Sequence, residues 1–170
     1  LDVDGERLLV TAAHNVLLSD RNNLATEIYA AVNPTAPDKT AVSVRCVVIG
    51  VAGQADIALL RPTWAGSGLQ GSDVEALELA VEAPSYGQAC YLVGNPLAIE
   101  TCSPSEGLIR DTNFTFYNLV ESVIVSAPAY GGNSGGPVLV VDDEGEASVV
   151  SILSFGFYDA PTISWGASWR

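Results

Sequence analysis

Residues 129–137 of the chain read Ala-Tyr-Gly-Gly-Asn-Ser-Gly-Gly-Pro, with two glycines on each side of an Asn-Ser pair. Glycine loses more backbone entropy on folding than any other residue, so this stretch is costly to order. It makes sense where backbone N–H groups must converge on a small anionic atom without an intruding Cβ. Ser134 would then be a nucleophile. The alternative is a Gly-rich turn between strands, and residues 129–137 alone favour it.

A second notable residue is His14, the only histidine, which follows the apolar residues 8–10 and the segment Thr-Ala-Ala. A neutral imidazole is the usual acceptor of a serine hydroxyl proton near pH 7. Taken alone, however, a single histidine at a strand end is more often structural than catalytic.

Asp56 heads the apolar stretch Ile-Ala-Leu-Leu of residues 57–60. A buried carboxylate needs hydrogen-bond partners to stay charged, and an imidazole N–H is a partner that would also fix the tautomer of the ring. Taken alone, Asp56 is better explained as an acid that caps a strand.

The order of these residues along the chain, His14, Asp56 and then Ser134, is that of chymotrypsin and not that of subtilisin or the α/β-hydrolases. The segments Thr-Ala-Ala-His, Asp-Ile-Ala-Leu-Leu and Gly-Asn-Ser-Gly-Gly-Pro resemble the three signature segments of the chymotrypsin/trypsin-like serine peptidases. Residues 149–156, Val-Val-Ser-Ile-Leu-Ser-Phe-Gly, resemble the strand that lines the primary specificity pocket of that family.

Two further features resemble the disulfide-poor, HtrA-like branch of the family. Asn133 occupies the place where digestive and clotting enzymes carry an aspartate that pairs with a new N-terminal ammonium after zymogen cleavage. An amide cannot form that ion pair, so we expect Asn133 to satisfy its polar atoms from nearby backbone without a cleavage switch. Residues 94–97, Gly-Asn-Pro-Leu, look like the segment that HtrA-like proteins carry before a hairpin of the second barrel.

The resemblance implies an all-β fold of two antiparallel β-barrels with the active site between them. Residues 1–83 would form the N-terminal lobe, with the histidine and the aspartate. Residues 84–170 would form the C-terminal lobe, with the serine, the oxyanion hole and the specificity pocket, the two making one peptidase domain. Residues 84–87 are the expected link. Relatives usually carry another strand before the histidine motif, so we expect the first barrel to be truncated at its N-terminus.

The apolar pattern independently predicts an all-β chain, because short apolar runs alternate with Gly, Pro, Asn and Asp and no helical period is sustained. A single helical turn is expected at residues 12–16 and a loop at residues 61–72. The predicted strands are residues 7–11, 26–32, 42–50, 57–60, 89–93, 107–110, 119–126, 137–141, 147–154 and 163–168.

The resemblance also implies a mechanism. Ser134 would attack the scissile carbonyl while His14 accepts its proton, and Asp56 would orient the imidazole. The backbone N–H groups of Gly132 and Ser134 would form the oxyanion hole.

Counting along the chain from Ser134 places the specificity pocket among six residues. None of them is acidic or a histidine, so we expect a neutral, small-to-medium apolar substrate side chain, and neither a basic nor a glutamate side chain. These residues are Pro128, Ala129, Tyr130, Ser154, Phe155 and Gly156.

Composition limits the partners. The formal net charge of -13 argues against nucleic-acid binding, and no apolar run approaches the ~18 residues of a membrane span. The expected partner is a polypeptide substrate. The mechanism needs no cofactor, and one histidine with scattered cysteines cannot supply a usual zinc ligand set. The sequence leaves the oligomeric state open. It also leaves the compartment open: the family resemblance favours a secreted or periplasmic protein, but a chain with so few cysteines is also compatible with an intracellular location.

The three cysteines form no dense disulfide framework. Each of Cys46, Cys90 and Cys102 lies in an apolar run, and we expect all three to be small core residues. A bridge between Cys90 and Cys102 is a less favoured alternative.

Two other functions remain open at this stage. One is a peptidase-fold binding or scaffold module that does not cleave, although no triad member is substituted. The other is an esterase that uses the same triad.

Overall fold

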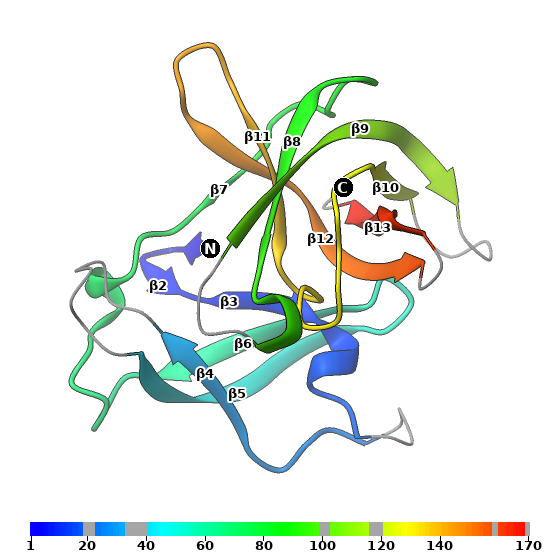
Figure 1. The fold of residues 1–170 in the computed structure, drawn as a ribbon. Coiled ribbons are helices and arrows are strands. Elements are labelled where there is room, and N and C mark those ends of the chain that lie inside the picture. Colours follow the sequence, from blue (N-terminus) through cyan, green and yellow to red (C-terminus); the bar gives the residue numbers. More distant parts are fainter. Residues whose placement is uncertain (19–22, 33–40, 99–102, 116–120, 158–159, 169–170) are drawn as a thin grey trace.

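The computed structural model describes residues 1–18, 23–32, 41–98, 103–115, 121–157 and 160–168. These residues form two lobes, each built on its own sheet (Figure 1). The prediction of an all-β chain is confirmed, since the helical elements are three 3-10 turns among the described residues: η1 (Ala13–Asn15), η2 (Gly71–Asp73) and η3 (Pro96–Ala98).

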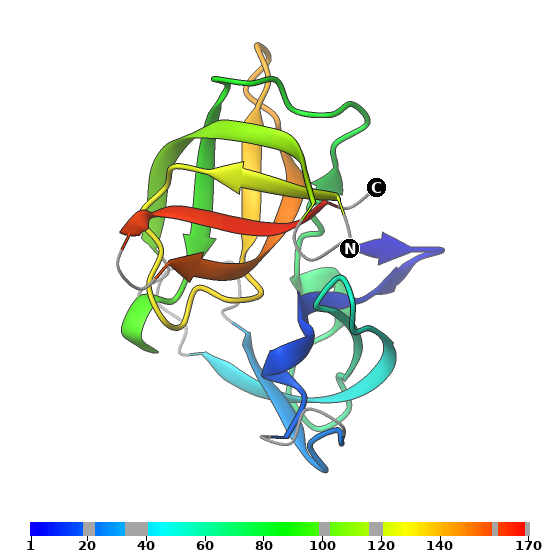
Figure 2. The ribbon, with the colours of Figure 1, turned by 90° about the vertical axis from the view of Figure 1, so that its right-hand side faces the viewer.

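The C-terminal lobe is a closed barrel of six antiparallel strands (Figure 2). The ring closes because β11 (Pro137–Val141) pairs with both β8 (Ala89–Gly94) and β12 (Ala147–Phe157). A short strand, β7 (Glu78–Leu79), adds to β12 in parallel. In spatial order the six barrel strands are β11 (Pro137–Val141), β8 (Ala89–Gly94), β9 (Ser103–Thr115), β10 (Glu121–Val125), β13 (Ala160–Ser168) and β12 (Ala147–Phe157).

The barrel interior is apolar because alternate side chains along each strand point inward. In β11 the burial alternates along Pro-Val-Leu-Val-Val, and Val138 and Val140 are the buried positions. The core residues of the barrel include Cys90, Leu92, Ile109, Val123, Val125, Val138, Val150 and Leu153.

The N-terminal lobe is a half-barrel, in agreement with the expected truncated first barrel: among the described residues its sheet has four strands in the order β3-β6-β5-β4. A two-stranded hairpin, β1 (Asp2–Val3) and β2 (Glu6–Arg7), precedes this sheet. In the core of this lobe, Cys46, Ala58 and Leu60 of the four-stranded sheet pack with Ala13 and Val16, which follow β3. The sheet strands are β3 (Leu9–Ala12), β4 (Ile28–Val32), β5 (Val42–Ala52) and β6 (Ile57–Thr63).

Each predicted strand is present, but several bounds differ. The strand expected at residues 7–11 is divided between β2 and β3, and β9 is far longer than the predicted 107–110. The loop predicted from residue 61 is wrong at its start, because β6 continues to Thr63 and Pro62 pairs in register with Cys46. β1 and β7 are not predicted, since two-residue strands carry no periodic signal. The boundary at 83/84 stays a prediction, and β7 joins the C-terminal sheet before it.

Candidate active site

His14 and Asp56 are brought together by the pairing of β3 with β6. Ala12 at the end of β3 is in register with Ile57 at the start of β6, so the residues just outside the ladder meet. The η1 turn then presents His14, whose Nδ1 lies 2.7 Å from Asp56 Oδ2 and whose backbone N–H donates to Asp56 Oδ1 at 2.9 Å. Asp56 itself adopts the left-handed region, with φ 53°. The predicted His–Asp contact is therefore present.

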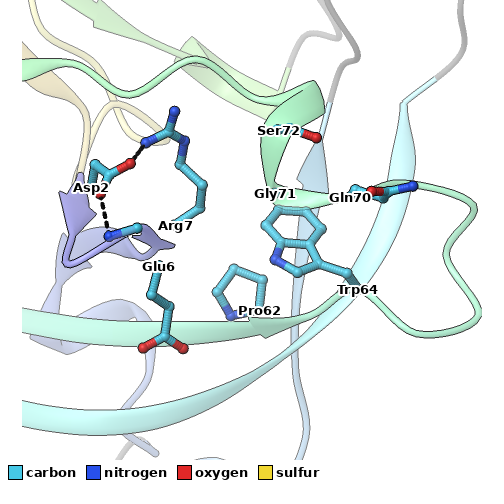
Figure 3. A pocket seen from close by; sticks show the side chains of 9 residues that line it. Asp2, Glu6, Arg7, Pro62, Trp64, Gln70, Gly71 and Ser72 are labelled. Atoms are coloured by element: carbon cyan, nitrogen blue, oxygen red, sulfur yellow. Dashed lines mark hydrogen bonds and ion pairs between the residues drawn. The ribbon is translucent and has the colours of Figure 1, made fainter.

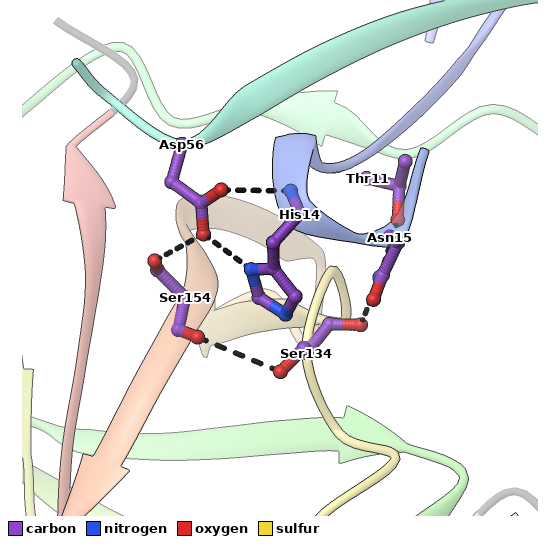
Figure 4. Close-up of polar contacts among 6 residues, drawn as sticks. All are labelled: Thr11, His14, Asn15, Asp56, Ser134 and Ser154. Carbon is purple, nitrogen blue, oxygen red and sulfur yellow. Dashed lines mark hydrogen bonds and ion pairs between the residues drawn. The ribbon is translucent and has the colours of Figure 1, made fainter. Parts of the chain in front are cut away.

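Ser154 is a third partner of this pair, which sequence reasoning missed. Its Oγ donates to Asp56 Oδ2 at 2.5 Å across the junction between the lobes (Figure 4). The sequence analysis placed Ser154 in the specificity pocket, which stays a prediction, and did not foresee the bond of its hydroxyl to Asp56. The sequence around Ser154 gave no signal for this contact, since the two residues lie 98 positions apart.

These contacts hold Asp56 in its charged form. Burial is the largest single influence and disfavours the charge, but the hydrogen bonds from the His14 ring, Ser154 and the His14 backbone together outweigh it, and the pKa of Asp56 is lowered. A carboxylate only accepts hydrogen bonds, so His14 Nδ1 carries the proton that it shares with Asp56. In the neutral imidazole this leaves Nε2 as the acceptor.

Ser134 lies in the loop before β11, and Figure 4 shows its side chain beside the imidazole of His14. Its Oγ donates to the Ser154 carbonyl at 3.5 Å and forms no hydrogen bond with the ring in this structure. Contacts of this kind often tighten only when substrate is bound. The structure therefore gathers all three predicted triad residues, with the Ser–His bond unformed.

The loop around Ser134 contains two backbone donors, the N–H groups of Gly132 and Ser134, on either side of the engaged N–H of Asn133. The Asn133 N–H donates to the Tyr130 carbonyl at 3.1 Å, and Gly132 has φ 100°, which favours glycine. The Leu97 N–H holds the Gly131 carbonyl at 2.7 Å. Since the two ends of a trans peptide point in opposite directions, the Gly132 N–H is directed away from Leu97. Neither this N–H nor that of Ser134 donates a hydrogen bond within the described part of the chain.

The glycines after Ser134 are required by close packing. A Cβ on Gly135, where φ is 85°, would lie 2.2 Å from Thr11 Oγ1. A Cβ on Gly136 would lie 2.2 Å from the Val93 carbonyl oxygen. These two contacts fix the loop that carries Ser134 against β3 on one side and β8 on the other.

Asn133 is 2% exposed and packs against Gly94, where an added Cβ would lie 2.6 Å from Asn133 Oδ1. That oxygen has no hydrogen-bond partner among the described residues. The expectation that Asn133 satisfies all its polar atoms from nearby backbone is therefore wrong for Oδ1.

Of the predicted pocket residues, Ala129 and Gly156 are close neighbours. A Cβ on Gly156 would lie 3.8 Å from Ala129 Cβ and 3.9 Å from the Cβ of Ser164, a buried residue that the sequence analysis missed. Phe155 instead lies against the imidazole, with its ring centroid 5.9 Å from that of His14.

The outer members of the predicted pocket are less enclosed. Tyr130 is 52% exposed, and Pro128 is half-buried.

A separate cavity of about 440 Å³ lies beside the N-terminal hairpin (Figure 3). Its charged side chains are engaged: Arg7 pairs with Asp2, and Glu6 pairs with Arg61. The cavity is lined by Asp2, Gly5, Glu6, Arg7, Pro62, Trp64, Gln70, Gly71 and Ser72.

The remaining sequence expectations concern cysteines, metals and membranes. Cys46 and Cys90 are free and buried, which removes the alternative of a Cys90 bridge, and Cys102 lies outside the described residues. Burial raises the pKa of the Cys90 thiol to about 11. Over the described ranges, no three His, Cys, Asp or Glu residues gather into a metal-binding group, and no helix has the length and apolarity to cross a membrane.

Residues 2–150 match the sequence pattern of the family described as trypsin-like peptidase domain. The chain belongs to the trypsin-like peptidase family. No curated protein sequence matches it.

Solved structures of bacterial proteases share the fold of this trypsin-like peptidase chain. The active form of the Rv3671c protease from M. tuberculosis is 18% identical with a TM-score of 0.68, over 95% of this chain and 64% of that one. The Yersinia pestis serine endoprotease is 16% identical with a TM-score of 0.71, over 99% of this chain and 52% of that one. The HtrA-type protease AlgW, solved with a decapeptide, is 20% identical with a TM-score of 0.70, over 99% and 47%. The chain thus spans about half to two thirds of the length of these proteins.

Proposed function

We propose that the chain is a serine endopeptidase that cleaves polypeptides through an acyl-enzyme, with His14, Asp56 and Ser134 as its triad. The observation that carries the proposal is the 2.7 Å bond between His14 Nδ1 and Asp56 Oδ2, with the glycine-flanked Ser134 beside the same imidazole. Family membership and the protease neighbours support it.

In the first half of the reaction, Ser134 Oγ forms a bond to the scissile carbonyl carbon and its proton passes to His14 Nε2. Asp56 stabilises the imidazolium, because its lowered pKa keeps the carboxylate negatively charged. The imidazolium then gives the proton to the leaving amine as the C–N bond breaks. In the second half, water attacks the carbonyl carbon of the resulting ester while His14 Nε2 takes its proton, and the imidazolium returns a proton to Ser134 Oγ as the ester C–O bond breaks.

The unpaired N–H groups of Gly132 and Ser134 would stabilise the negative oxygen of the tetrahedral intermediate. One such donor contributes about 10²–10³ in rate. The backbone glycines supply these donors without a side chain in the way, so this part of the mechanism needs no cofactor.

The substrate side chain next to the scissile bond would lie against Ala129 and Gly156, which neighbour Ser164. These side chains are small and uncharged, so a small neutral residue fits best. This narrows the sequence expectation of a small-to-medium apolar side chain.

A fluorophosphonate probe tests the proposal, with wild type compared with Ser134→Ala and His14→Ala. We expect an adduct on Ser134, none in Ser134→Ala and strongly slowed labelling in His14→Ala, together with Ser134-dependent cleavage of an unfolded polypeptide. An adduct on another residue, or equal labelling in His14→Ala, contradicts the triad. Absence of labelling favours a binding module, and hydrolysis of p-nitrophenyl acetate without peptide cleavage favours an esterase.

A further inference from the structure

Asn15, the residue after the catalytic histidine, connects the two lobes at the nucleophile. Its Nδ2 donates to the backbone carbonyl of Ser134 at 2.9 Å and to Thr11 Oγ1 at 3.1 Å (Figure 4). A carboxamide NH₂ group has two hydrogens, so both are used. One bond stays within the N-terminal lobe, and the other reaches into the C-terminal barrel lobe.

The peptide group between Ser134 and Gly135 is held from both ends. Asn15 binds its carbonyl, and its N–H donates to the Leu153 carbonyl on β12 at 2.8 Å. The packing is equally close, because a Cβ on Gly135 would lie 2.9 Å from Asn15 Nδ2. The nucleophile loop therefore rests directly on the Asn15 side chain.

We propose that Asn15 is a positioning residue that sets the separation of the Ser134 hydroxyl from the His14 imidazole. His14 and Asn15 are consecutive in the three-residue turn η1, so a bond from Asn15 to the Ser134 backbone fixes the serine relative to the ring. Thr11 in turn fixes the rotamer of Asn15. The inference rests on the proposed function, because it assumes a proton transfer from Ser134 to His14.

We call the two hydrogen bonds from Asn15, to Ser134 and to Thr11, the clamp. The clamp should matter more for catalysis than for folding. Asn15 is exposed, and its two bonds replace bonds to water, so their loss should change the melting temperature little. A misplacement of about 1 Å between reacting groups, by contrast, can cost about 10²-fold in rate. A fall in kcat without a matching fall in stability therefore distinguishes positioning from a structural role.

The test compares kcat, KM and melting temperature for Asn15→Leu and Asn15→Asp with those of wild type on one peptide substrate. Leucine keeps the approximate size without donors, and aspartate keeps the shape but places a carboxylate against the Ser134 carbonyl. We expect kcat to fall at least about tenfold in both, with KM within about twofold. The matched control is Asn113→Leu, an exposed asparagine on β9, which should behave as wild type.

Thr11 provides a graded variant if the Asn15 variants fold poorly. Thr11→Val removes the Oγ1 acceptor but leaves the bond from Asn15 to Ser134, so kcat should fall about two- to fivefold. Thr11→Ser keeps the hydroxyl and should recover most of that loss. Unchanged kcat in folded Asn15→Leu, or equal loss in Thr11→Ser and Thr11→Val, overturns the clamp.

A spectroscopic measurement separates the clamp from the rest of the site. His14 is the only histidine, so its imidazole gives a single set of NMR resonances. In Asn15→Leu the Nδ1 proton bonded to Asp56 should keep its wild-type shift while kcat falls. A lost Nδ1 resonance in Asn15→Leu would mean that Asn15 supports the histidine and not the serine. If wild type fails to label at Ser134 with a fluorophosphonate, the proposed function itself is wrong.

Discussion

The backbone N–H of Leu97 donates a 2.7 Å hydrogen bond to the carbonyl of Gly131, and Leu97 does so from the left-handed region, with φ 58°. A bulky residue avoids that region, because its Cβ crowds the following carbonyl. The bond orients the Gly131–Gly132 peptide, and with it one proposed oxyanion donor. Leu97, in a strained conformation, is thus hydrogen-bonded to the loop that precedes Ser134.

We therefore predict opposite effects for two substitutions at Leu97. Leu97→Gly relieves the strain, so the free energy of unfolding should stay equal or rise by up to about 1 kcal/mol, with kcat retained. Leu97→Pro removes the N–H and forbids the positive φ, so kcat should fall at least about tenfold. Urea unfolding and steady-state kinetics measure both, and wild-type kcat in a folded Leu97→Pro would contradict the role of this bond.

Asn133→Asp should destabilise the protein. The side chain is 2% exposed and Oδ1 already lacks a partner, so a charge there would be buried without a cation. An uncompensated buried charge typically costs about 3–5 kcal/mol. Urea unfolding at pH 7 checks this, with Asn113→Asp on the exposed face of β9 as the control for added charge alone. Equal stability of the two variants would show that a cationic partner reaches Asn133.

The hydrogen bond from Ser154 to Asp56 should be visible in the pH dependence of stability. The pKa of Asp56 is lowered on folding, so its contribution to stability is complete above the unfolded value, about 3.9, and is lost as pH falls through the folded value. Ser154→Ala should shrink this contribution, and Asp56→Asn should abolish it. Unfolding free energies between pH 2 and pH 6 measure the difference, and superimposable wild-type and Ser154→Ala curves would refute the assignment.

The same Ser154→Ala variant should lower kcat by about tenfold. A hydrogen bond to a charged group contributes about 1.5–3 kcal/mol, and part of that stabilises Asp56 while the imidazole is charged. KM should change little, because the Ser154 hydroxyl faces the aspartate and not the substrate. A change confined to KM would instead return Ser154 to the pocket.

Reductant should leave the melting temperature within about 1 °C, because Cys46 and Cys90 are free thiols in the core. Burial raises the pKa of both, that of Cys90 to about 11, so little thiolate forms at pH 8. Both should react with a disulfide reagent only as the protein unfolds. A large drop in melting temperature on reduction would mean that a bridge stabilises the fold.

The sequence determined the features that depend on local periodicity and on residue type. A short apolar run between two glycines and two aspartates gave β11 its bounds, residues 137–141, because such a run bounded by turn-forming residues is typical of a strand. The single histidine and the glycine-flanked serine are the basis of the proposed chemistry, because few residue types accept a proton at neutral pH or tolerate a crowded turn. The His–Asp contact followed from the order of the motifs.

Only the tertiary structure decided which side chains meet across the two lobes. Ser154 was expected in the pocket but donates to Asp56, which lies 98 residues away, and Asn15 reaches the Ser134 carbonyl over 119 residues. The two-residue strands β1 and β7 and the backbone bond between Leu97 and Gly131 likewise had no signal in the local sequence. Such contacts depend on how the lobes and loops dock, and docking is set by the summed packing of many residues, which no local pattern encodes.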